Sequence, residues 1–133
     1  MKVTELRIGN IIGGTYTDYD DGSEKYDVCK VVALDSVGAA EYPIWVQGNA
    51  NVEKYDSFDP VPLTDEWLIK LGFKYLSEHL CWNKNEHDVS FYSSGVIEFI
   101  PFGDDCYPVH IKYVHQLQNI YFALRGEELH FTL

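Results

Sequence analysis

A short helix with clear start and stop signals, in residues 60–73, constrains the fold of this chain more than any other feature. Two prolines at its start favour extended backbone in the residues before them, so the helix begins only after them. Thr64 is a typical N-cap residue, and the two acidic residues that follow it suit the positive end of the helix dipole. Gly72 is placed to end the helix at its C′ position. The helix separates an N-terminal part, residues 1–59, from a C-terminal part, residues 60–133.

The N-terminal part has the pattern of an all-β structure. Residues 7–12 form one predicted strand, which ends at Gly13 and Gly14, where backbone freedom permits a bend or bulge. Two further strands are predicted over residues 26–34 and 42–47, separated by polar turns. This pattern indicates a small, strongly bent sheet.

The C-terminal part combines strands with a second helix. Strands are predicted over residues 73–82, 87–92 and 96–100, with short polar turns between them. A helix is predicted over residues 113–125, because apolar residues recur there at helical spacing and a glycine follows. Its buried stripe is expected to be Val114, Leu117, Tyr121 and Leu124. Residues 129–133 alternate apolar and polar side chains, which predicts a last strand.

Together these elements predict an α+β fold with the order β-β-β-α-β-β-β-α-β. The sheet is expected to be mainly antiparallel and strongly bent, with two helices packed on it. A length of 133 residues fits a single domain over residues 1–133.

The charge of the chain argues against several classes of partner. Its 21 acidic and 10 basic residues give a formal net charge of −11. This argues against general binding of nucleic acid, which needs Lys and Arg to displace phosphate counterions, and against adsorption to anionic membranes. No apolar run approaches the roughly 20 residues that a membrane span requires. The odd number of cysteines and the absence of a secretory signal predict a reduced, cytoplasmic protein.

Three segments carry a resemblance to a known family. They are ELRIGN at residues 5–10, PLTDEWLIKLGF at residues 62–73 and KYVHQLQNIYFALRGEEL at residues 112–129. In these segments the chain resembles a family of small uncharacterised proteins carried by phages and mobile elements of gut Bacteroidetes, and it departs from them in loops such as residues 18–24. The family contributes no known catalytic residues. The resemblance implies a protein made in the bacterial host cytoplasm by a genetic parasite, where short genes often encode inhibitors or decoys of host defence.

No motif indicates catalysis, a bound metal or a cofactor. Zinc sites need closely spaced Cys and His ligands, and the candidate ligands lack such a spacing. These candidates are His79, Cys81, His87, Cys106 and His110. The acidic turn at residues 18–24 differs from a calcium loop because its glycine falls at position 5 instead of 6. Since neither a nucleophile elbow nor a phosphate loop is found, a non-catalytic function is expected.

The last predicted helix offers the best candidate for a binding surface. Opposite its apolar stripe, His115, Gln118, Asn119 and Phe122 share a face at offsets of 3, 4 and 7 residues. An aromatic ring beside amides and an imidazole can hold a planar ligand and bond to its edges. The alternative is that Phe122 packs beneath a neighbouring strand and that the polar side chains face water.

Two functions compete on this basis. The first is sequestration of a small anionic ligand, a nucleotide-type signal, in a pocket that an association of several copies could complete. Its predicted contacts are Arg7, Trp45, Lys112, His115, Asn119, Phe122 and Arg125. The second is an acidic decoy that inhibits a nucleic-acid-binding defence protein of the host by direct protein–protein contact, for which the net charge of −11 provides electrostatic steering. A third function, hydrolysis of such a signal, is supported by no sequence motif.

Overall fold

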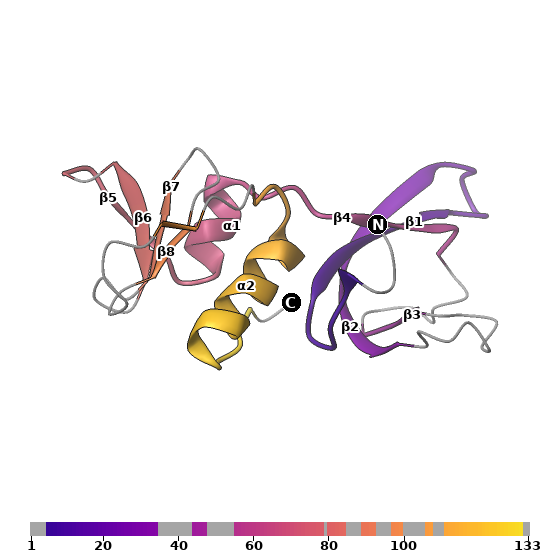
Figure 1. Cartoon of the computed structure of the whole chain (residues 1–133). Helices are drawn as coiled ribbons and strands as arrows, with labels where there is room; N and C mark the ends of the chain where they lie inside the picture. The colour runs from indigo at the N-terminus through magenta and orange to yellow at the C-terminus, as the bar shows by residue number, and fades with distance from the viewer. Residues whose placement is uncertain are drawn as a thin grey trace. The chain divides into compact units, whose positions relative to one another are not determined.

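The chain forms two compact units. The computed structural model describes residues 5–34, 44–47, 55–78, 80–84, 89–92, 97–99, 106–107 and 111–131 (Figure 1). The first unit spans Met1–Val61 and the second spans Pro62–Phe131, a division close to the predicted boundary between the two parts of the chain. Among the described residues, no helix is both long enough and apolar enough to cross a membrane.

The first unit contains a four-stranded antiparallel sheet in the order β3-β2-β1-β4. Its strands are β1 (Ile11–Thr17), β2 (Glu24–Leu34), β3 (Ile44–Gln47) and β4 (Ser57–Pro60). The long strand β2 pairs with β1 along its first part and with β3 along its last part, and the register shifts between Val31 and Ala33. The irregularity of the sheet therefore lies in β2 and not at the glycines of β1, where it was expected.

The segment before β1 is a closed turn, so the prediction of a strand over residues 7–12 is wrong for its first half. The backbone N–H of Asn10 donates to the Arg7 carbonyl at 3.1 Å, and the Asn10 side-chain oxygen accepts from the Arg7 N–H at 2.7 Å. Gly9 has a φ of 97°, which this kind of turn requires and which a side chain would oppose. The strand begins only after this turn.

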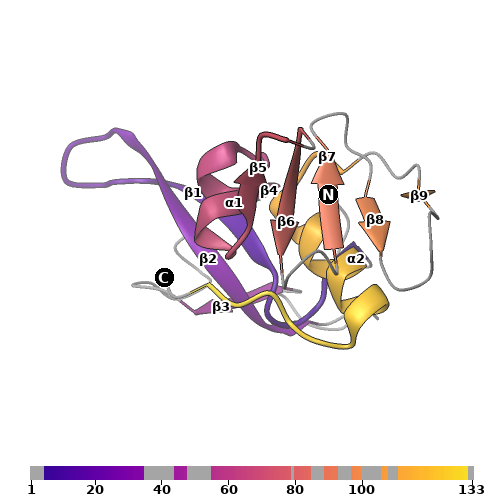
Figure 2. The ribbon, with the colours of Figure 1, turned by 90° about the vertical axis from the view of Figure 1, so that its left-hand side faces the viewer.

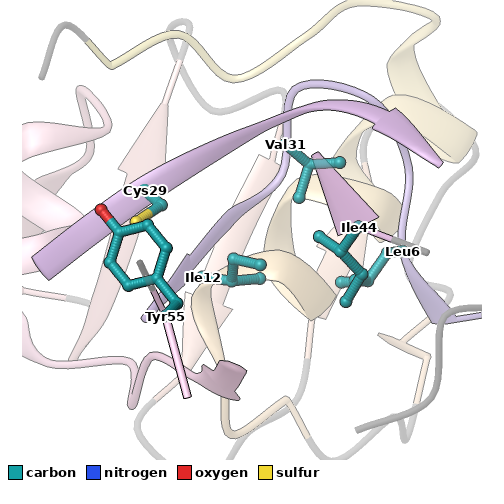
Figure 3. Packing of buried hydrophobic residues seen from close by; sticks show 6 residues of the cluster. All are labelled: Leu6, Ile12, Cys29, Val31, Ile44 and Tyr55. Carbon is teal, nitrogen blue, oxygen red and sulfur yellow. The ribbon is translucent and has the colours of Figure 1, made fainter. Parts of the chain in front are cut away.

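Gly13 and Gly14 lie inside β1 because tyrosine rings occupy the space where their side chains would be. A Cβ atom on Gly14 would lie 2.5 Å from the Tyr55 ring, and one on Gly13 would meet the Tyr26 ring on the opposite face of the sheet. The Tyr55 side belongs to the core of the first unit, shown in Figure 3. Its buried residues are Leu6, Ile12, Cys29, Val31, Ile44 and Tyr55.

The second unit contains a five-stranded antiparallel sheet in the order β5-β6-β7-β8-β9 and two helices. The strands are β5 (Lys74–Leu76), β6 (Cys81–Lys84), β7 (Val89–Tyr92), β8 (Ile97–Phe99) and β9 (Cys106–Tyr107). The helices are α1 (Asp65–Lys70) and α2 (Val114–Arg125), and both lie on the same side of this sheet (Figures 1 and 2). The rings of Phe73 and Tyr121 contact edge to face with centroids 6.5 Å apart, which links α2 to the start of the sheet.

The local signals at the helix ends are confirmed. The Thr64 hydroxyl accepts a hydrogen bond from the Trp67 backbone N–H at 3.3 Å. Gly72 follows α1 with a φ of 90°, and Gly126 caps α2 in the left-handed conformation at 70°.

The α+β class with antiparallel strands and two helices is confirmed, whereas several strand limits differ from prediction. Residues 73–82 form a hairpin of two strands, with a turn in which Leu80 has a φ of 52°. Strand β4 and strand β9 were not predicted. Residues 129–131 of the predicted last strand are not in a strand, and residues 132–133 lie outside the described residues.

Candidate functional site

Helix α2 carries most of the predicted site residues, and its first turn is held by a side-chain amide. The Gln116 side-chain oxygen accepts from the backbone N–H groups of Lys112 and Tyr113, at 2.9 and 3.1 Å. These bonds satisfy backbone donors just before the first turn, and they fix the direction in which the chain enters α2.

The two helices of the second unit begin side by side. The Leu63 backbone N–H donates to the Lys112 carbonyl at 2.9 Å, and Pro62 and Tyr113 form an isolated antiparallel bridge. Because these contacts precede both helices directly, the start of α2 is positioned by the start of α1.

The buried face of α2 is wider than its apolar stripe. Val114, Leu117 and Tyr121 are buried as predicted, whereas Leu124 is only partly buried. His115 and Gln118 are 2% and 1% exposed, so the alternative in which both face water is wrong. A helix in a layered fold can be covered on more than one side, which the spacing of apolar residues does not reveal.

Three predicted contacts lie together on the second half of α2. Phe122 is 38% exposed, and the partly buried Asn119 and Arg125 lie three residues before and after it. Side chains three residues apart are neighbours on a helix surface. This part of α2 therefore presents an aromatic ring, an amide and a guanidinium next to one another.

The structure does not bring the other predicted contacts to this position within the second unit. Lys112 is exposed but precedes α2, and a helix of 12 residues is about 18 Å long, so its backbone lies far from Arg125. Tyr113 and His115 stack with ring centroids 6.0 Å apart near the same end. Arg7 and Trp45 belong to the first unit, Arg7 in the turn before β1 and the 48% exposed Trp45 on β3.

Sequence reasoning missed a polar group in the core of the first unit. The Tyr55 hydroxyl donates to the Asp27 carboxylate at 3.0 Å. Burial, followed by hydrogen bonding with Cys29 and Asp27, raises the pKa of Tyr55 far above its ordinary value. The only sequence signal for the close packing of the Tyr55 ring was Gly14, which lies against it.

A lysine in the second unit was missed for a similar reason. Lys84 donates from Nζ to the Leu71 carbonyl at 2.8 Å, and the absence of a side chain on Gly72 leaves room for the ammonium group. Burial lowers the pKa of Lys84. The contact satisfies a carbonyl at the negative end of α1, which is a structural role.

The candidate metal ligands lie mostly outside the described residues. Cys29 and Cys81 are buried, and neither forms a disulfide. Within the described part of the chain, no group of three His, Cys, Asp or Glu side chains could hold a metal ion. The positions of His79, His87 and His110 and the side chain of Cys106 lie outside that part.

No family model, curated protein or solved structure matches this chain. The resemblance to proteins of phages and mobile elements therefore stays a prediction from the three sequence segments that carry it.

Proposed function

We propose that this chain is a non-catalytic accessory protein of a phage or mobile element that binds a small, planar, anionic ligand of the nucleotide type. By holding the ligand, the protein would keep it from a host defence receptor. The observation that carries the proposal is the exposed ring of Phe122 between Asn119 and Arg125 on α2.

Each of these three side chains supplies one interaction that such a ligand needs. The Phe122 ring offers a stacking surface for a base, and the Asn119 amide can both donate to and accept from a base edge. The Arg125 guanidinium can pair with a phosphate in a bidentate manner. Because the last turn of a helix is its negative end, an anion at this position depends on Arg125 for compensation.

The remaining predicted contacts have separate roles in this proposal. Lys112 lies at the opposite end of α2 from Arg125. A small ligand bound to Arg125 is therefore too short to extend along the helix to Lys112. His115 is buried, and its contribution would be to shape the helix rather than to present a free edge to solvent. Arg7 and Trp45 stay predicted contacts from the first unit.

Sequestration sets a requirement on affinity. Competition with a host receptor requires a dissociation constant near or below about 1 μM, equivalent to about −8 kcal/mol. Calorimetry of the whole chain against linear and cyclic nucleotides measures this directly. The ligand recovered after denaturation should have its original mass, because the proposal includes no reaction.

Variants on α2 test whether the binding occurs at the proposed place. Phe122→Ala should weaken binding by about tenfold or more, since stacking of one base contributes about 1–3 kcal/mol. Arg125→Gln should weaken binding of phosphate-bearing ligands most. Tyr19→Ala is the matched control, because Tyr19 is an exposed aromatic residue of the first unit. Unchanged binding by both α2 variants, or no binding of any nucleotide by the native chain, would contradict the proposal.

A further inference from the structure

The outer face of the sheet in the first unit combines an exposed aromatic ring with carboxylates. Strand register places Glu24 and Tyr26 of β2 opposite Thr17 and Thr15 of β1, and Asp59 of β4 opposite Gly13. These residues alternate with those that face the core, so they share the face that points away from it. Glu24, Tyr26 and Asp59 are all exposed in the complete chain.

The Tyr26 ring lies across this face instead of projecting freely from it. A Cβ atom on Gly13 would meet the Tyr26 hydroxyl and the adjacent ring carbons, so the outer half of the ring covers this glycine. Tyr26 is nevertheless 53% exposed. A ring supported in this way has lost part of its rotational freedom before any partner binds, which lowers the entropic cost of a contact.

Carboxylates surround the ring. Asp59 is next to the glycine that the ring covers, and burial together with the Asp59 charge raises the pKa of Tyr26. Glu24 lies two residues before Tyr26 on the same strand. The Thr17 hydroxyl donates to Asp56 at 3.3 Å, which holds a third exposed carboxylate beside this face.

The described cations of β2 do not neutralise this group. Lys25 points to the core side of the sheet and pairs with Asp21 at 3.3 Å. Lys30 is on the outer face but lies opposite Ile11, four residues along β2 from Tyr26, and it is only partly exposed. Among the residues that the structure describes, the face around the ring is therefore negative.

We infer that the outer face formed by Tyr26, Glu24, Asp56 and Asp59 docks an extended, arginine-rich segment of a partner protein. An aromatic face attracts a guanidinium, and carboxylates pair with it in a bidentate manner. Glu24 and Tyr26 are alternate residues of β2, so they are about 7 Å apart, which is also the spacing of alternate side chains in an extended peptide. Charge complementarity thus favours a segment with two arginines separated by one residue.

This inference goes beyond the proposed function, because it concerns the first unit and a protein partner. The two can fail separately, since the residues tested here are distinct from those on α2.

The test uses the whole chain and a labelled peptide with acetylated and amidated ends. The peptide carries Arg-Thr-Arg between Gly and Ser residues, and in the control peptide citrulline replaces both arginines. Fluorescence anisotropy should show binding of the arginine peptide, weakening as salt rises from about 50 to about 500 mM, because exposed charges are screened. Equal binding of the citrulline peptide, or no binding of either, would overturn the inference.

Charge variants assign the binding to this face. Glu24→Gln, Asp56→Asn and Asp59→Asn together should weaken binding about tenfold, as expected for three exposed ion pairs. The matched control changes the same charge in the second unit, at Asp65, Glu66 and Glu78, which are exposed. An equal loss in the control would mean that only net charge matters and would overturn the assignment.

The ring is tested by two substitutions of Tyr26. Tyr26→Leu should weaken binding about threefold by removing the cation–π contact, whereas Tyr26→Phe should keep it. If Tyr26→Leu binds the peptide with unchanged affinity, the Tyr26 ring does not contribute to the binding site. Tight calcium binding by the native chain, abolished in the triple carboxylate variant, with no peptide binding, would assign these carboxylates to a metal and overturn the inference.

Discussion

The two units expose their residues according to different rules. In the first unit, strand register separates a core face with Ile12 from an outer face with Tyr26. Exposure follows the alternation along β2, whereas in β1 both Ile11 and Ile12 are buried. In the second unit, α2 buries His115 and Gln118 beside Leu117, so polarity does not indicate exposure. Strand alternation therefore marks the exposed side chains of β2, whereas polarity does not mark the exposed side chains of α2.

Among substitutions that compare the two units, the largest loss of stability is expected at the centre of α2. Leu117 is completely buried, so Leu117→Ala should cost about 2–5 kcal/mol through lost burial and a residual cavity. Urea unfolding followed by NMR of fluorinated tryptophan reports on the units separately, because Trp45 lies in the first and Trp67 and Trp82 in the second. The second unit should unfold at lower urea than in the native chain. An equal shift of the Trp45 signal would show that the units unfold together.

A smaller effect compares the two faces of β1. Gly14→Ala places a methyl group against the buried Tyr55 ring and should cost about 1–3 kcal/mol. Gly13→Ala meets the far end of the exposed Tyr26 side chain, which can move away, so its cost should be clearly smaller. Denaturant melts of both variants measure the difference. A larger cost at Gly13 would contradict the assignment of the two faces.

The smallest effects concern alkaline pH, where the two units should respond in opposite directions. The folded chain holds the Tyr55 proton more tightly than the unfolded chain, so this stabilisation is complete below pH about 10 and falls as pH rises further. The pKa of Lys84 is lowered from 10.5, so in the window below this value the unfolded chain binds more protons, and stability of the second unit rises with pH.

The substitutions Tyr55→Phe and Lys84→Met should each flatten the slope of stability against pH in their own unit. The measurement is the urea midpoint of each fluorotryptophan signal between about pH 8 and 11. If the slope of stability against pH is unchanged in one of these variants, the substituted residue does not cause the pH response of its unit.

The sequence predicted helix ends better than strand ends, for a physical reason. Thr64 and Gly126 act on backbone groups within a few residues, so their effect is local. Local sequence predicts a strand end at Gly13 and Gly14, because the tyrosines that require these glycines lie outside β1, on β2 and before β4. The turn at Leu80 has a leucine where a glycine would be expected, so the local sequence does not predict this turn.

The candidate site was predictable to a similar degree. Helical spacing correctly made Asn119 and Phe122 neighbours, and the helix rise alone separates Lys112 from Arg125. The burial of His115 depends on what covers the helix, which spacing along the chain does not specify. The outer face around Tyr26 was absent from the prediction because Asp59 lies on a strand that was not predicted.

The bridge between Pro62 and Tyr113 has a consequence for the order of events during synthesis on the ribosome. It joins positions some fifty residues apart, whereas the strands of the first unit all lie within Met1–Val61. Closing so long a loop is entropically costly and must wait until the later segment has emerged. We therefore expect the first unit to fold while α1 still lacks its partner segment, so the apolar side of α1 stays exposed to chaperones until the segment around Tyr113 has emerged.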